Sequence, residues 1–272
     1  MNTALIKKFR ERIYTYFAHN RRVLPWRDTQ DPYRIFVSEV MLQQTQVDRV
    51  LAKYRAFIAA FPDIYSLAKA TFAHVFSLWQ GLGYNRRAMY LIRSARMVVE
   101  RFSGHFPAEI NKLTELPGVG KNTACAIAAF AFNKPVVFIE TNIRSVYLHF
   151  FFTGKKSVKD SKLLPLIEKT LDAKNPRMWY FALMDYGAML KKNYTNPSRG
   201  SHHYAKQSAF AGSLRELRGK ILKIVMEKGK IHEADLIKNL QGDQRIDKVL
   251  EDLQKEGFVK RTRKHIHIAD GF

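Results

Sequence analysis

The sequence predicts a mainly α-helical protein with a small mixed module at its C-terminal end. Apolar residues recur at helical spacing through residues 1–190. No segment before residue 255 alternates between apolar and polar side chains as a half-buried strand does. From Leu214 onward, three short helical stretches precede the alternating segment FVKRTRKHIHIA. We therefore expect an array of helices, with strands only near the end of the chain.

The first helix is expected over residues 4–19, because Leu5, Phe9, Ile13 and Phe17 follow one another at intervals of four. The proline-punctuated loop RRVLPWRDTQDPY comes next, and a long helix is expected over residues 33–61, up to the breaker FPD. Further helices are expected over residues 63–69, 72–79, 85–102, 109–115, 121–132, from Glu140 onward, 162–171 and 177–190.

The C-terminal stretches LRELRGKILKIVMEKGK, HEADLIKNLQ and DQRIDKVLEDLQKEG read as three helices, and the alternating segment after them reads as a β-hairpin. Three helices and a two-stranded wing are typical of a winged helix-turn-helix, although a dimerisation module can have the same shape. Residues 191–213 combine Asn, Ser, Gly, Pro and basic residues, as a linker does. We therefore expect a helical domain over 1–190, a basic linker over 191–213 and a winged-helix domain over 214–272.

Composition favours a polyanionic partner. The 46 Lys and Arg residues outnumber the 24 acidic ones and give a net charge of +22, which favours binding to nucleic acid, although a merely basic or ribosome-associated protein would look similar. The single cysteine, Cys125, lies in an apolar helical run and is expected in the core, so no metal site is expected. No run of residues is apolar enough to span a membrane, and the N-terminus is too charged for a signal peptide. We expect a cytoplasmic monomer, associated with the nucleoid in a prokaryote.

The segment ELPGVGKNTA predicts a stiff corner between two helices. Pro117 cannot continue a helix, and glycine permits backbone angles that other residues resist. The N–H groups at the start of the following helix, together with the charge of a lysine, can bind a phosphate diester. The expected phosphate-binding residues are Gly118, Val119, Gly120 and Lys121. A plain tight turn between helices is the alternative.

The segment LPGVGKNTACAI resembles the helix-hairpin-helix of the DNA glycosylase superfamily that includes endonuclease III. The segments LPWRDTQDPYRIFVSEVMLQQTQVDRV, LWQGLGYNRRAMYL and ALMDYGAM resemble the adenine DNA glycosylase branch in particular. The resemblance covers about residues 5–190. It implies a helix-hairpin-helix glycosylase fold of two helical lobes, a DNA N-glycosylase activity in base excision repair, and mismatched or damaged double-stranded DNA as the partner.

Two carboxyl groups are candidates for the chemistry. Release of a purine from deoxyribose requires a proton for the leaving base and negative charge near the cationic sugar. Glu39 lies in the apolar stretch IFVSEVML, where desolvation raises a carboxyl pKa as a general acid requires. The resemblance assigns Glu39 the protonation of the leaving adenine and help in activating water. A structural hydrogen bond to Ser38 or Arg34 is the alternative.

Glu140 is the second candidate, at an expected junction between an extended segment and a helix. The resembled family has aspartate here, which stabilises the cationic sugar or bonds to it transiently. The extra methylene of glutamate puts full activity in doubt, since a displacement of about 1 Å can cost about 100-fold in rate. A helix N-terminal carboxylate with no catalytic role is the alternative.

Other residues take their roles from the same resemblance. Strand-cutting relatives carry a lysine at the position of Asn122, and that lysine forms a Schiff base with the sugar. Asparagine cannot form a Schiff base, so the resemblance implies a monofunctional glycosylase. Gln43, Gln44 and Tyr84 match positions that wedge into the base stack or line the pocket, although Tyr84 could be a core residue. Asn142 and Arg27 match positions near the sugar and the base.

The sequence departs from this family in two places. The four cysteines of an iron–sulfur cluster loop are missing after MDYGAM, so no cofactor is expected, and Lys191, Lys192, Arg199 and Lys206 could hold DNA instead. A winged helix replaces the usual C-terminal domain that reads the opposite base. Its expected DNA contacts are Arg245, Lys248, Arg261 and Arg263.

The sequence therefore predicts a monofunctional glycosylase that removes a mispaired purine. The expected substrate is adenine opposite 8-oxoguanine or guanine. A thymine or uracil mismatch glycosylase is an alternative that Glu39 disfavours, because a pyrimidine lacks the ring nitrogen that this acid would protonate. A non-catalytic DNA-binding protein with a degenerate site is a second alternative.

Overall fold

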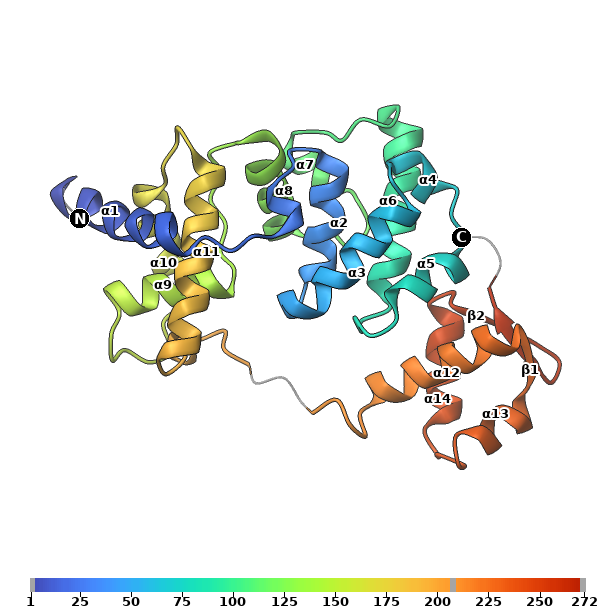
Figure 1. The fold of residues 1–272 in the computed structure, drawn as a ribbon. Coiled ribbons are helices and arrows are strands. Elements are labelled where there is room, and N and C mark those ends of the chain that lie inside the picture. Colours follow the sequence, from blue (N-terminus) through green and yellow to red (C-terminus); the bar gives the residue numbers. More distant parts are fainter. Residues whose placement is uncertain (1–2, 206–208, 270–272) are drawn as a thin grey trace. The chain divides into compact units, whose positions relative to one another are not determined.

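The computed structural model describes residues 3–205 and 209–269, and Figure 1 shows its fold as a ribbon. Contacts within the chain group it into two compact units. The first unit comprises Met1–Val40 and Phe106–Lys206, and the second comprises Met41–His105 and Gln207–Phe272. None of the helices in the described ranges has the length and apolar character needed to cross a bilayer.

The first unit is helical and is built around a large aromatic core. Phe9 lies against Tyr147 and Trp179, with ring centroids 5.5 and 5.8 Å apart, and all three side chains are buried. Cys125 is buried in the same core, as predicted. The elements of this unit are α1 (Thr3–Asn20), η1 (Pro25–Arg27), α2 (Pro32–Leu42, ending two residues beyond it), α7 (Ile110–Thr114), α8 (Lys121–Phe132), α9 (Thr141–Phe151), α10 (Asp160–Thr170), α11 (Pro176–Asn193) and η2 (Pro197–Gly200).

Helices α9 and α11 approach closely at Gly187. A β-carbon placed on Gly187 would lie 2.2 Å from the backbone carbonyl oxygen of Asn142, far inside van der Waals contact. Only glycine therefore allows α11 to pass the first turn of α9 at this distance. The glycine of the MDYGAM segment thus fixes the position of the residues at the start of α9.

Replacing Gly187 by alanine should destabilise the protein by at least about 2 kcal/mol, because the new methyl group meets backbone that cannot turn away. Urea unfolding measures the change. Gly219→Ala is the matched control: Gly219 lies inside a helix, α12 (Leu214–Lys228), and has open space at the β-carbon. That substitution should stabilise the protein by about 0.5–1 kcal/mol through helix propensity. Equal effects of the two substitutions would contradict the close approach.

The second unit combines helices of the central sequence with the C-terminal module. Arg87 is buried, and its guanidinium donates to the carbonyl oxygens of Met41 at 2.8 Å and Gly83 at 3.0 Å, which ties α6 to the segments before it. The elements are α3 (Val47–Ala60), α4 (Ile64–Ala68), α5 (Phe72–Trp79), α6 (Arg86–Phe102), α12, β1 (Lys230–His232), α13 (Glu233–Asn239), α14 (Ile246–Lys255), β2 (Val259–Thr262) and β3 (His265–Ile268).

The C-terminal module packs directly on helices of residues 41–105. The ring of Phe258, which is fully buried, lies 5.3 Å from that of Phe72. The carboxylate of Glu256 pairs with Arg218 of its own module and with Arg86 of α6. An apolar contact and a shared carboxylate thus join the module to this part of the chain.

The structure corrects two expectations about secondary structure. The helix predicted over 33–61 is interrupted after Leu42, and Gln44 there has a φ of 55°, which is incompatible with a continuous right-handed helix. The predicted hairpin is present as β2 and β3, but β1 joins it to form a three-stranded antiparallel sheet in the order β1–β3–β2. This strand has only three residues, too few to show an alternating pattern.

Candidate functional site

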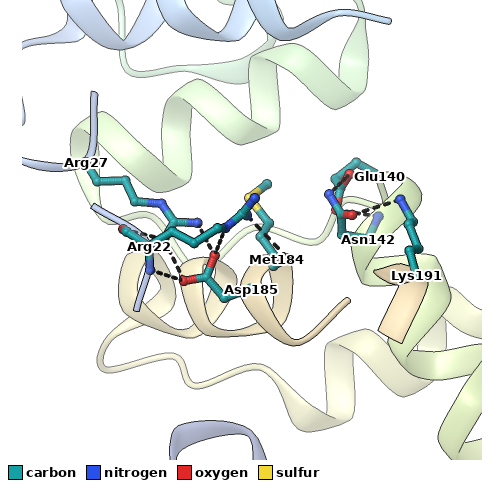
Figure 2. Close-up of polar contacts among 7 residues, drawn as sticks. All are labelled: Arg22, Arg27, Glu140, Asn142, Met184, Asp185 and Lys191. Atoms are coloured by element: carbon teal, nitrogen blue, oxygen red, sulfur yellow. Dashed lines mark hydrogen bonds and ion pairs between the residues drawn. The ribbon is translucent and has the colours of Figure 1, made fainter. Parts of the chain in front are cut away.

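Two groups of polar contacts in the first unit involve residues of α11, one at Asp185 and one at Lys191 (Figure 2). Asp185 is almost completely buried and accepts both N–H groups of the Arg27 fork at 2.8 Å. It also accepts the side chain of Arg22 at 2.5 Å. Burial alone would raise the pKa of Asp185, but the hydrogen bonds and charges of these arginines outweigh it and hold the pKa below its ordinary value.

Arg27 is held on three sides. Its side chain is 4% exposed, its guanidinium lies 4.7 Å above the ring of Phe181, and its backbone carbonyl accepts from Arg177 at 3.1 Å. The guanidinium therefore has a fixed orientation in which Asp185 takes two of its donors. The predicted role of Arg27 near the base remains a prediction, and the structure gives it a second role in packing α11 against the loop before α2.

Glu140 caps the N-terminus of α9. Its Oε1 accepts from the backbone N–H groups of Asn142 and Ile143, both at 2.8 Å, and its Oε2 accepts from the Asn142 side-chain amide at 3.0 Å. The longer side chain thus folds back onto its own helix, where the positive end of the helix stabilises its charge. Both oxygens are held while the residue stays partly exposed.

Glu39, on α2, has the electrostatic properties expected of a general acid. It is half-buried, and desolvation, followed by the charge of Glu140, raises its pKa to about 8, against a smaller lowering by Arg27. Its two proposed structural partners are engaged elsewhere: Ser38 donates to the carbonyl of Ile35 at 2.8 Å, and Arg34 lies 3.6 Å from Asp31. Glu140 therefore lies close enough to Glu39 for its charge to act on the Glu39 carboxyl group.

Lys191 reaches the same helix end from the last turn of α11. Its Nζ donates to the Asn142 Oδ1 at 2.8 Å and lies 3.2 Å from the Thr141 hydroxyl (Figure 2). Burial lowers its pKa, partly offset by the attraction of Glu140. The sequence predicted a DNA contact for Lys191, and the structure brings it into the network of Glu140 and Asn142.

The predicted corner joins α7 to α8. Gly118 has a φ of 77°, which favours glycine, and the buried Val119 anchors the turn. Gly120 does not use the conformational freedom of glycine, because its φ is −80°, which any residue can adopt. Its β-carbon position faces open space, and its predicted part in phosphate binding remains a prediction. Lys121 and Asn122 are exposed in the first turn of α8.

The second unit contains the three residues predicted to enter the base stack. A cavity of about 360 Å³ is lined by Gln43, Gln44, Tyr84, Asn85, Arg86, Arg87, Arg215 and Arg218. Gln44 and Tyr84 have φ values of 55° and 49°, which are uncommon outside glycine and cluster at functional sites. The Tyr84 hydroxyl accepts from Arg215 of α12 at 2.9 Å, so the C-terminal module also contributes to this cavity.

The remaining predicted DNA-binding cations differ in their surroundings. Lys192, Arg199, Lys248 and Arg263 are exposed, whereas Lys206 lies outside the described residues. Arg245 pairs with Asp243 at 2.6 Å, and Arg261 pairs with Glu233. Two of the expected contacts are therefore already engaged by acidic neighbours.

One important residue was missed by sequence reasoning. Asp185 was read only as part of the MDYGAM segment, although a carboxylate in the apolar helix WYFALMDYGAML is the same signal that identified Glu39. Its arginine partners lie more than 150 positions away along the chain. Their pairing could be found only once the fold was known.

Comparison with known proteins identifies the family of this chain. The model of the HhH-GPD superfamily of base excision DNA repair proteins matches residues 37–168. The adenine DNA glycosylase of Buchnera aphidicola (subsp. Baizongia pistaciae) is 34% identical over 187 residues, 67% of this chain and 52% of that protein. The chain thus spans about half the length of this relative. The human adenine DNA glycosylase is 35% identical over 69% of this chain and 36% of its own length.

The adenine DNA glycosylase of Mycolicibacterium smegmatis matches over nearly the whole of both proteins, with 30% identity over 92% of each chain. Among solved structures, a thermostable thymine-DNA glycosylase aligns with a TM-score of 0.61 and 25% identity over 73% of this chain and 96% of its own. A trapped endonuclease III–DNA covalent intermediate aligns with a TM-score of 0.54 and 17% identity over 70% of this chain and 86% of its own, and so shares the fold. The chain therefore belongs to the HhH-GPD superfamily of base excision DNA repair proteins and, within it, to the adenine DNA glycosylase family.

Proposed function

We propose that the protein is a monofunctional DNA glycosylase that removes adenine mispaired with 8-oxoguanine or guanine and leaves an abasic site. The observation that carries the proposal is that Glu39 and Glu140 lie in the same unit, near enough to interact electrostatically, and that the pKa of Glu39 is raised to about 8. A carboxyl group that keeps its proton at neutral pH can donate it to a leaving purine. The names of the relatives support adenine as that purine.

The proposed reaction assigns one task to each carboxyl group. Glu39 gives its proton to a ring nitrogen of the extruded adenine while the bond between that base and C1′ breaks. The carboxylate of Glu140 faces the positive charge that develops on the sugar. A water molecule then bonds to C1′ and loses a proton to Glu39, which restores the acid. Base extrusion must come first, because the bond is inaccessible in a stacked duplex.

The DNA would be held by the corner and by the C-terminal module. Gly118 to Lys121 offer helix N–H groups and one cation to a phosphate, as in other helix N-terminal anion sites. Residues 214–272 would act as a winged helix, with Lys248 and Arg263 exposed for backbone contacts. Tyr84 and Gln44 would enter the base stack. A glycosylase domain over 1–190 and a basic connection over 191–213 complete this assignment, for a monomer that acts on chromosomal DNA without a cofactor.

A second candidate is a thymine or uracil mismatch glycosylase. It is favoured by the structural similarity to a thermostable thymine-DNA glycosylase. A pyrimidine offers no counterpart to the purine nitrogen that Glu39 would protonate, so the raised pKa of Glu39 favours the purine substrate.

Single-turnover base release from a set of duplexes should distinguish these functions. We expect release of adenine opposite 8-oxoguanine or guanine, at a rate at least about 100-fold above that of adenine opposite thymine, because extrusion is cheapest from a mismatch. Thymine and uracil opposite guanine are the comparison substrates. Preferred release of either pyrimidine would establish the second candidate, and no release from any duplex would reject an active glycosylase.

The same reactions test the monofunctional assignment. Borohydride added during turnover should trap no protein–DNA adduct, because Asn122 has no amine with which to form a Schiff base. A trapped adduct would overturn that assignment and direct attention to Lys121 and Lys191.

A further inference from the structure

Lys191 occupies an unusual position for a lysine. It approaches the N-terminus of α9, where the helix dipole is positive and a cation is disfavoured. It is also half-buried, and burial lowers its pKa. The exposed lysine beside it, Lys192, has neither constraint. A specific interaction must therefore offset the cost of placing this side chain here.

The compensating interaction runs through Asn142 to Glu140. The ammonium of Lys191 donates to Asn142 Oδ1 at 2.8 Å, and Asn142 Nδ2 donates to Glu140 Oε2 at 3.0 Å. Glu140 also stabilises the charge of Lys191 through space. Lysine can only donate and a carboxylate can only accept, so the amide between them has one permitted orientation.

We propose that Lys191 is a positioning residue, which fixes the Asn142 amide and through it the Glu140 carboxylate that faces the sugar. Without Lys191 the amide can turn and present its oxygen to the carboxylate, which repels it. A glutamate needs this restraint more than an aspartate does, because it has one more rotatable bond. The inference rests on the proposed function, in that Glu140 is taken to act on the sugar.

The backbone around Lys191 is held well enough to support this role. The segment after α11 is fastened to the first turns of α9, where the Ser198 hydroxyl lies 2.7 Å from that of Ser145 and donates to the carbonyl of Thr141 at 3.2 Å. Gly187, one turn before Lys191, lies against the backbone of Asn142. Residues on either side of Lys191 in the sequence are thus held against Thr141 and Asn142, the two residues that Lys191 contacts.

Lys191→Met should lower the single-turnover rate of base release about 10- to 100-fold at saturating enzyme. The affinity for the duplex should fall only by the amount expected when one surface cation is removed. Lys169→Met, on the exposed surface of α10, removes the same charge away from the site and should leave the rate unchanged. Lys191→Gln should recover part of the rate, because its amide can still donate to Asn142.

The coupling with Asn142 provides a readout that does not depend on activity. Lys191→Met and Asn142→Ala should together shift the urea unfolding midpoint by less than the sum of their separate shifts, because either one breaks the same chain of contacts. Additive shifts would overturn the inference even if the wild-type protein released no base and the proposed function had failed. If the wild-type protein is active, equal rates for the methionine variants at 191 and 169 would overturn the inference alone.

Discussion

Glu39→Gln should slow base release about 10²- to 10⁴-fold, the range that general acid catalysis contributes, while duplex binding changes by no more than about threefold. Glutamine keeps the size and the hydrogen bonding of the protonated acid but cannot give up a proton to the leaving base. Single-turnover kinetics and gel-shift titration on one mismatched duplex measure the two quantities. Equal loss of both would show that Glu39 holds DNA or the fold rather than acting as an acid.

The pH dependence follows from the direction of the pKa shift. The proposed acid is active only when protonated, and its pKa of about 8 means that the rate should fall as the pH rises through 8. An unshifted glutamate would lose its proton near pH 4.5 and leave no acid at neutral pH. Glu39→Gln should remove this decline together with the activity.

Glu39→Gln should change stability in the opposite sense to activity. Because the folded-state pKa of Glu39 lies above its unfolded value, the native protein binds more protons between pH 4.5 and 8, and stability falls as the pH rises through this window. Glu39→Gln should abolish that fall and leave the protein more stable at pH 8, by about 1–3 kcal/mol, since each pKa unit is worth about 1.4 kcal/mol. Glu168→Gln, on the exposed surface of α10, is the control and should change neither property.

The general nature of the site was visible in the sequence because local context determines it. An acid within the apolar stretch IFVSEVML must be desolvated, and a carboxylate at the start of a helix must meet free N–H groups, wherever the rest of the chain lies. The structure gives Glu39 its raised pKa and makes Glu140 the cap of α9. The glycine-bent corner before an apolar helix was predictable for the same reason.

The contacts that hold these groups were not predictable, because they join distant segments. Asp185 meets Arg22 and Arg27, and Lys191 meets Asn142, only through the packing of α11 on other elements. The interruption of α2 after Leu42 was missed because glutamine is a good helix former, and nothing local requires Gln44 to take a positive φ. Such a backbone angle is imposed by the surrounding fold.

Glu140→Ala should reduce base release about 10³-fold or more, because it removes the charge that we propose to stabilise the cationic sugar. It should also destabilise the protein by about 0.5–2 kcal/mol, since the N-terminus of α9 loses its cap. Glu140→Asp separates these effects. Aspartate is a preferred N-cap residue whose shorter side chain reaches the N–H groups of Asn142 and Ile143 directly. We expect it to retain stability and to keep the rate within about tenfold of the wild type, or to raise it.

Glu140→Gln completes the comparison, because it retains a cap oxygen and the length of glutamate but has no charge. If the charge acts on the sugar, base release should rank Asp and Glu together, far above Gln and Ala, whereas the free energy of unfolding should set only Ala well below the others. Single-turnover rates and urea unfolding on the same four proteins give both rankings. A glutamine variant as active as the wild type would mean that Glu140 only ends a helix. An aspartate variant as inactive as alanine would mean that the pocket has been rebuilt around the longer side chain, with Asn142 and Lys191 as part of that change.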